Sequence, residues 1–337
     1  MGHPRHVVIL VKENHSFDNY FGTFPGVEGV RLERSPNPPP LDPRHDHGAW
    51  LTRERTAVMR QFTENDLPAY FAFARQFTLC DHYFTDVAGP STPNHLMLIA
   101  ADSPVIDNPP RYRLPAAAAP FQIPSLPASL ERAGLTWGNY GGYAFDMIEG
   151  LRGRRKIPSA QFAKDAAAGS LPSVSWVYAP HDLSEHPPDP PDRGAQPPVG
   201  DVTRGMQWTA EQVDAVLRGG LWPATAIFIT WDDWGGWFDH VEPECVERWK
   251  DDGSHPAFDG TQFRYGPRVG CLVLGPYARR GYVSKARHSH VSVLRFCEML
   301  FGLPPLNARD ASADDFSDCH DFGGPPGPPP VTTRRHP

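Results

Sequence analysis

The apolar residues of this chain gather in short continuous runs, and each run is followed by polar residues capable of chemistry. The first run, Val7–Val11, is β-branched and aliphatic, and it predicts a strand buried on both faces, as in the middle of a parallel sheet. It stops abruptly at Lys12, and Glu13 and Asn14 follow. Further strands are expected over residues 77–84, 135–140, 174–178, 224–231 and 269–274.

Segments with apolar residues at helical spacing alternate with these strands. We expect helices over residues 64–77, 125–133, 159–168, 208–218 and 290–303. Thr63 or Asn65 is expected to cap the first helix, and Gly219-Gly220 to stop the fourth. The alternation predicts an α/β fold with a largely parallel or mixed sheet and helices on both faces, so that the polar clusters line one edge of the sheet.

Proline- and glycine-rich stretches separate the predicted elements. The stretch from residue 22 to 50 is long for a loop in a compact domain, which is typical of a functional segment. We expect one domain over residues 1–322, followed by a disordered Pro/Gly-rich tail over residues 323–337. No internal repeat is present.

Composition narrows the possible partners and compartments. The net charge of −7 argues against a nucleic-acid partner and gives no general attraction to an anionic membrane. Val7–Val11 is too short to span a bilayer, so no stable membrane insertion is expected. No secretory signal is visible, so the chain as written is expected to be cytoplasmic, although a chain with its leader removed would look the same. The five cysteines lack zinc-like spacing, which favours buried thiols and leaves one or two disulfides possible.

Two pairs of oxygen donors follow the two strongest predicted strands. Glu13 and Asn14 follow the first, and Asp232 and Asp233 follow residues 224–231. Acids at a strand end are commonly solvated turn residues, but the adjacent Gly235-Gly236 allows a close backbone approach. Together the four side chains would offer up to four oxygen ligands to a divalent cation, such as Ca²⁺, Mg²⁺, Mn²⁺ or Zn²⁺. Without a cation, the three carboxylates would repel and raise one another's pKa.

Ser91 lies in the segment Gly-Pro-Ser-Thr-Pro-Asn-His over residues 89–95. Its ordinary interpretation is a helix N-cap with proline at an early helical position. The alternative is a nucleophile, because a hydroxyl at a helix N-terminus lies in a positive field and a metal would lower its pKa further. Asn94, one helical turn away, could then donate to phosphoryl oxygens.

The chain has 15 histidines, and a surface or structural role is the default for each. Six of them lie in loops or near predicted strand ends: His45, His47, His181, His186, His240 and His290. Together they could supply phosphate contacts and a general acid. Basic patches within residues 34–55 and 152–156 are expected to be solvated faces, although the second could steer an anionic substrate.

Two long segments resemble a known family. Residues 12–22, KENHSFDNYFG, and residues 231–241, WDDWGGWFDHV, are similar to signatures of the bacterial phosphoesterase family that holds phospholipases C and an acid phosphatase. Residues 89–95, 185–188 and 275–283 match further family segments, and the resemblance runs from about residue 5 to about residue 305.

The resemblance implies an alkaline-phosphatase-like, three-layer α/β fold and a single phosphoesterase catalytic domain. It implies one divalent metal held by Glu13, Asn14, Asp232 and Asp233, with the hydroxyl of Ser91 completing the shell. Ser91 would attack phosphorus to form a phosphoserine, and His186 would bind or protonate the ester. The remaining substrate contacts are assigned to Asn94, His95, His47 and His240.

The substrate is expected to be a small phosphomonoester or a phospholipid head-group diester. Many family phospholipases carry threonine where this chain has Ser91, whereas the acid-phosphatase branch carries serine, which favours monoesters. One alternative is a catalytically silent binding protein on the same fold. Another is a related sulfatase-like hydrolase, although residues 91–95 lack the arginine of a formylglycine-type motif. The oligomeric state is left open.

Overall fold

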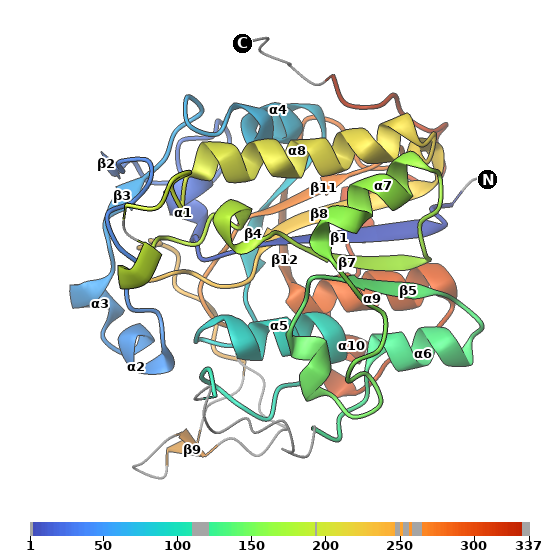
Figure 1. The fold of residues 1–337 in the computed structure, drawn as a ribbon, viewed down its shortest axis with the longest axis horizontal. Helices are drawn as coiled ribbons and strands as arrows, with labels where there is room; N and C mark the ends of the chain where they lie inside the picture. The colour runs from blue at the N-terminus through green and yellow to red at the C-terminus, as the bar shows by residue number, and fades with distance from the viewer. Residues whose placement is uncertain are drawn as a thin grey trace.

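A computed structural model describes residues 3–109, 121–192, 194–246, 250–251, 256–257 and 265–331. Its centre is an eight-stranded sheet in the order β12-β4-β11-β8-β1-β7-β5-β6 (Figure 1). The strands are β1 (His6–Lys12), β4 (Thr78–Phe84), β5 (Trp137–Tyr140), β6 (Lys156–Ile157), β7 (Val174–Tyr178), β8 (Thr225–Trp231), β11 (Cys271–Leu274) and β12 (Tyr282–Ser289). Only β11 runs against its neighbours, β4 and β8, so the predicted mostly parallel sheet is confirmed.

The first strand lies in the middle of this sheet, as its sequence predicts. β1 pairs in parallel with β7 on one side and β8 on the other, with Leu10 opposite Val177 and Ile229. Every residue of Val7–Val11 is at most 1% exposed. Burying each such aliphatic side chain contributes roughly 1.5–3 kcal/mol, so this strand anchors the core.

Helices cover both faces of the sheet and make three layers (Figure 1). One face carries α4 (Pro68–Gln76), α7 (Phe162–Ala167) and α8 (Val202–Arg218), and the other carries α5 (Ser91–Ala100), α6 (Leu126–Arg132), α9 (His290–Phe301) and α10 (Ala308–Ser312). Near the carboxyl ends of the strands lie α1 (Phe17–Phe21), α2 (His47–Trp50), α3 (Arg53–Thr56) and the paired β2 (Glu33–Arg34) and β3 (Arg60–Gln61). β9 (Lys250–Asp251) and β10 (Pro256–Ala257) form a separate pair.

Short 3-10 helices complete the described chain. They are η2 (Ala144–Met147), η3 (Ser159–Gln161), η4 (His181–Leu183), η5 (Pro190–Asp192), η6 (Trp222–Ala224) and η7 (Ser317–Cys319). In the part of the chain that the structure describes, no helix is both long enough and apolar enough to cross a bilayer.

Two predicted helix boundaries are wrong, and one strand was not predicted. Helix α4 begins at Pro68, and Thr63 does not cap it, because the backbone N–H and hydroxyl of Thr63 both donate to Asp66 Oδ2 at 3.0 Å. Helix α8 begins at Val202, well before the expected residue 208, because the Asp201 carboxylate accepts from the first-turn amides. Strand β12 was not predicted, because it is an edge strand whose partly exposed polar residues lack an apolar run.

The described part of the tail lies against the domain. The Gly327 N–H donates to Pro276 O at 2.6 Å, and the Val331 N–H donates to the side chain of Gln76 at 2.7 Å. The predicted disorder therefore finds no support over residues 323–331, while residues 332–337 lie outside the described chain. The division of the chain at residue 322 stays a prediction.

Candidate active site

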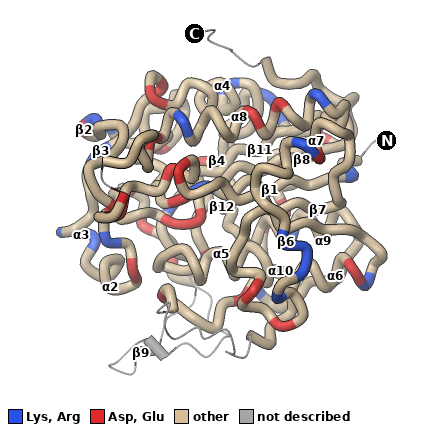
Figure 2. The backbone as a smooth tube through the Cα atoms, viewed as in Figure 1, with Lys and Arg blue, Asp and Glu red and all other residues tan. Residues whose placement is uncertain are grey.

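The candidate site lies where β1 and β8 end side by side. Lys12 of β1 is opposite Trp231 of β8 in the parallel register, so the next two residues of each strand emerge together at one edge of the sheet. The backbone confirms this proximity, because the Asn14 N–H donates to Asp232 Oδ1 at 3.1 Å. Figure 2 shows several acidic positions gathered where these strands run out. The structure thus brings together the two donor pairs that the sequence places far apart.

The two glycines after Asp233 make this close packing possible. Gly235 has a φ of +59°, and a Cβ there would lie 2.1 Å from Asn14 O. Asn14 itself has a φ of +63°, a left-handed conformation that asparagine tolerates better than most residues. Its side-chain oxygen Oδ1 is buried and accepts no hydrogen bond within the described residues. A buried amide oxygen without a donor is an available cation ligand.

The three carboxylates of the site differ in the direction in which their pKa values are shifted. Burial would raise the pKa of Asp232, but the His95 ring, 3.0 Å from Asp232 Oδ2, holds it below its usual value. Burial and the charge of Asp232 raise the pKa of Asp233 to about 7. Burial and Asp232 also raise the pKa of Glu13. The predicted mutual repulsion is therefore present, and a bound cation would relieve it.

Ser91 is the first residue of α5, and Pro90 occupies the N-cap position. The Ser91 hydroxyl makes no capping bond and instead donates to Asp233 Oδ2 at 3.0 Å. The N-cap interpretation of Ser91 is therefore wrong. The hydroxyl therefore contacts a proposed metal ligand, and it also lies at the N-terminal, positive end of a ten-residue helix.

Asn94 holds the turn that presents Ser91. Its Oδ1 accepts from the Val87 N–H at 3.0 Å, and its amide donates to Val87 O and Pro90 O, each at 3.1 Å. These bonds use both amide hydrogens of a fully buried side chain. The hydrogen bonds make Asn94 a positioning residue, and they lend no support to the predicted donation to phosphoryl oxygens.

Two histidines face the acidic group. His45 Nε2 lies 3.3 Å from Asn14 Nδ2. Burial would lower the pKa of His45, but Asp233 and Asp42 raise it to about 9. Burial likewise opposes a charge on His186, yet Glu13 and Asp42 raise the pKa of its ring above the usual value. Ligand atoms of Asp42, His45 and His186 lie within 4.8 Å of one another.

The structure places three other predicted contacts elsewhere. His47 Nδ1 donates to Ala88 O at 2.7 Å and supports the loop before Ser91. His95 is buried behind Asp232, where it orients the carboxylate. His240 Nδ1 lies 2.6 Å from Asp18 Oδ2, in a separate network. His45 also lies against the site although it was not among the assigned contacts, because the sequence cluster His45-Asp46-His47 does not show which ring lies next to Asn14.

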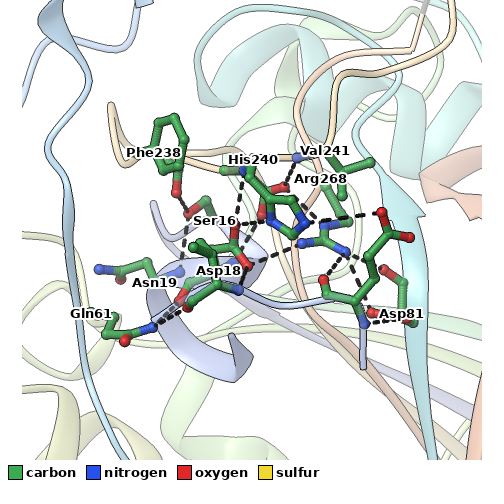
Figure 3. A network of polar contacts seen from close by, with 12 residues as sticks. Ser16, Asp18, Asn19, Gln61, Asp81, Phe238, His240, Val241 and Arg268 are labelled. Atoms are coloured by element: carbon green, nitrogen blue, oxygen red, sulfur yellow. Dashed lines mark hydrogen bonds and ion pairs between the residues drawn. The ribbon is translucent and has the colours of Figure 1, made fainter. Parts of the chain in front are cut away.

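That separate network ties the two signature segments together (Figure 3). Arg268 is fully buried and contacts Asp18 Oδ1 at 3.2 Å and Asp239 Oδ1 at 3.0 Å. The Ser16 hydroxyl donates to Phe238 O at 2.7 Å in the same region. The residues after Asn14 are thus locked to the residues after Asp233, which explains what this part of each signature does.

A divalent cation fits the donors of the site. Asn14 Oδ1 lacks a donor, Ser91 offers a hydroxyl, and the crowded carboxylates of Glu13, Asp232 and Asp233 supply the charge. Ligand atoms of Asp42, His45 and His186 lie within 4.8 Å of one another, whereas those of the three carboxylates do not form such a group. The donor set for a cation therefore includes the amide oxygen of Asn14 and the hydroxyl of Ser91. All are hard oxygen ligands.

The family model for the phosphoesterase family matches residues 4–41 and 41–304. The chain belongs to this family. Non-hemolytic phospholipase C of Pseudomonas aeruginosa is 28% identical over 95% of this chain and 57% of that protein. Phospholipase C B of Mycobacterium tuberculosis is also 28% identical, over 96% of this chain and 78% of that protein. The chain therefore spans little more than half the length of its Pseudomonas relative.

Solved structures share the fold at low identity. The lipoteichoic acid synthase LtaP of Listeria monocytogenes superposes with a TM-score of 0.51 at 10% identity, over 90% of this chain and 73% of that chain. At this identity the likeness speaks for the fold alone. With the strand order above, the predicted α/β fold with a mostly parallel central sheet is confirmed.

Proposed function

We propose that this family member is a metal-dependent phosphoric-ester hydrolase that works through a phosphoserine at Ser91. The observation that carries the proposal is the 3.0 Å hydrogen bond from the Ser91 hydroxyl to Asp233 Oδ2, beside the donor-free Asn14 Oδ1. The substrates proposed are phosphomonoesters and phospholipid head-group diesters. Relatives named as phospholipases C support this class.

The first step uses the hydroxyl of Ser91. Its proton passes to Asp233 Oδ2, which accepts the hydroxyl's hydrogen bond, as a lone pair of Oγ attacks phosphorus. The new Oγ–P bond forms as the bond from phosphorus to the leaving oxygen breaks. His186 lies beside Glu13 and has a raised pKa, so its imidazolium can give a proton to that oxygen.

The second step regenerates the serine. Water attacks phosphorus, the P–Oγ bond breaks, neutral His186 accepts a proton from the water, and Asp233 returns a proton to Oγ. Asn94 keeps the 87–90 loop in place throughout, because its amide spans that loop. His95 holds the orientation of Asp232 through its 3.0 Å contact.

The cation would be held by Glu13, Asn14, Asp232 and Asp233 with Ser91. When bound, it would lower the pKa of the Ser91 hydroxyl and offset charge on the transferring phosphoryl group. The oxygen donors suit Ca²⁺, Mg²⁺ or Mn²⁺, with Zn²⁺ as a further candidate.

Substitution of Ser91 tests the nucleophile. Ser91→Ala should reduce turnover of p-nitrophenyl phosphate or p-nitrophenyl phosphorylcholine by at least about 10³-fold, because no oxygen remains to attack phosphorus. Thr92→Ala is the matched control, since the neighbouring hydroxyl contacts Tyr143 instead of Asp233. Normal turnover by the Ser91 variant would disprove the assignment.

A parallel assay separates the substrate classes. An aryl phosphate and phosphatidylcholine are compared with and without chelator, and the chelator should abolish both activities. The ratio of the two rates decides between monoester and diester preference. No saturable hydrolysis of either substrate by metal-loaded protein would favour the silent binding alternative.

A further inference from the structure

A second group of metal-ligand side chains lies outside the candidate active site. It consists of Cys80 on β4, His288 on β12, and Cys319 and Asp318 on η7. The first three are fully buried, and their ligand atoms all lie within 4.8 Å of one another. They are far apart in the sequence, so no local motif reveals them.

Four of the six separations among these donors lie close to the edges of a zinc tetrahedron. Cys80 Sγ and Cys319 Sγ are 3.9 Å apart, and Cys319 Sγ is 3.7 Å from His288 Nε2. Asp318 Oδ1 lies 3.3 Å from Cys319 Sγ and 3.5 Å from His288 Nε2. Ordinary zinc bond lengths in a regular tetrahedron give roughly 3.8 Å for S···S, 3.6 Å for S···N, 3.5 Å for S···O and 3.3 Å for N···O.

We propose that Cys80, Cys319, His288 and Asp318 bind one structural Zn²⁺ ion. Two sulfurs and an imidazole are soft or borderline ligands that favour zinc over the hard cations suited to the all-oxygen site. Four protein ligands close the coordination shell, as structural zinc sites require. Coordination replaces the two thiol protons, which pass to solvent.

Neighbouring side chains provide the outer contacts that such a site needs. His288 Nδ1 lies 2.6 Å from Asp314 Oδ1, which leaves Nε2 to face the metal, as in carboxylate–histidine–zinc triads. The hydroxyls of Ser284 and Tyr282 donate to Asp318 Oδ2 at 2.5 and 3.2 Å, which offsets its charge. Ser284 Oγ is also 2.9 Å from His288 Nε2, a contact that metal binding would replace.

The ion would join three segments at one edge of the sheet. β12 is the edge strand, β4 is its neighbour, and η7 follows α9 and α10 along the chain. The stacking of Phe316 on His288, with ring centroids 4.3 Å apart, already holds this segment against β12. Zinc would therefore stabilise the folded chain by mass action without taking part in hydrolysis.

Cobalt substitution tests the site in the whole 337-residue chain. The chain is purified with reductant, stripped of metal and titrated with Co²⁺, which reports sulfur ligands through a thiolate-to-cobalt charge-transfer absorption. We expect one equivalent of Co²⁺ to give this band, and Zn²⁺ to displace it. Because the cation ligands proposed for the candidate active site include no sulfur, the variant Asp232→Asn/Asp233→Asn should keep the band.

Matched variants assign the ligands. Cys319→Ala should abolish the band, whereas Cys297→Ala, another buried cysteine but outside the group, should keep it. Zn²⁺ should raise the Tm of Asp232→Asn/Asp233→Asn, in which the candidate active site is disabled, and leave unchanged the Tm of the triple variant that also carries Cys319→Ala. The proposal is overturned if folded wild-type protein shows no thiolate band, if Cys319→Ala retains it, or if Zn²⁺ does not raise the Tm of Asp232→Asn/Asp233→Asn.

Discussion

His186 shows how a single side chain is prepared for proton transfer. Its Nδ1 lies 2.6 Å from Pro187 O, so the Nδ1 proton is held by that carbonyl and the Nε2 proton is the one available for transfer. Burial works against the charged ring, but Glu13 and Asp42 raise its pKa. His15 shows the opposite case, because burial lowers the pKa of its ring to about 3 and leaves it neutral, packed on Tyr20.

The effect of His186→Ala should depend on the leaving group. An alkyl phosphate needs protonation of its leaving oxygen, so kcat/KM should fall about 10²–10⁴-fold, whereas p-nitrophenyl phosphate should lose much less. Kinetics on the two substrates measure this difference. His82→Ala is the control, because that ring pairs with Glu28 outside the site. Equal losses on both substrates would assign His186 to binding alone.

At the level of elements, the site depends on how the β1 and β8 strand ends are joined. The parallel register brings the two donor pairs together, and the loop after Asp233 then packs directly on the backbone of Asn14. Both strands were predictable because a continuous apolar run is a local signal. The edge strand β12 was not, because its pairing with β4 is decided by a distant partner.

Gly235→Ala should damage this junction. The new Cβ would lie 2.1 Å from Asn14 O, in addition to the strain of a positive φ, so we expect a loss of more than about 2 kcal/mol in stability and a loss of activity. Gly220→Ala is the matched control: its φ is +69° and no atom of the described residues lies within 4 Å of the new Cβ, so it carries the strain alone, about 1–2 kcal/mol. Denaturant unfolding compares the two, and equal losses would contradict the steric argument.

The stability of the whole molecule should depend on a buried acid far from the site. Glu298 of α9 is fully buried, and burial together with Asp310 raises its pKa to about 9, although Arg295 opposes the shift. The folded protein therefore holds this proton more tightly than the unfolded chain. Its contribution to stability is fully present below the ordinary pKa of 4.5 and is lost as the pH rises towards 9.

Glu298→Gln should remove this pH dependence. The variant keeps a neutral side chain at every pH, so its stability relative to wild type should rise by up to about 1.4 kcal/mol for each pH unit between about 5 and 9. Urea unfolding at pH 5.5 and pH 7.5 measures the change. Glu211→Gln, at an exposed position of α8, is the control for the altered net charge. The same difference at both pH values would refute a raised pKa of Glu298 in the folded protein.

The sequence by itself determined the buried strands, the four donors at their ends and the resemblance to the phosphoesterase family, because apolar runs and contiguous signatures are local. Only the tertiary structure decided that His45 turns inward while His47 and His240 serve other contacts, because the loops converge through packing that no periodicity encodes. The same holds for Cys80, His288 and Cys319, because their spacing along the chain does not predict a metal site. The pairing of β12 with β4 and the packing of η7 against β12 bring the three side chains together.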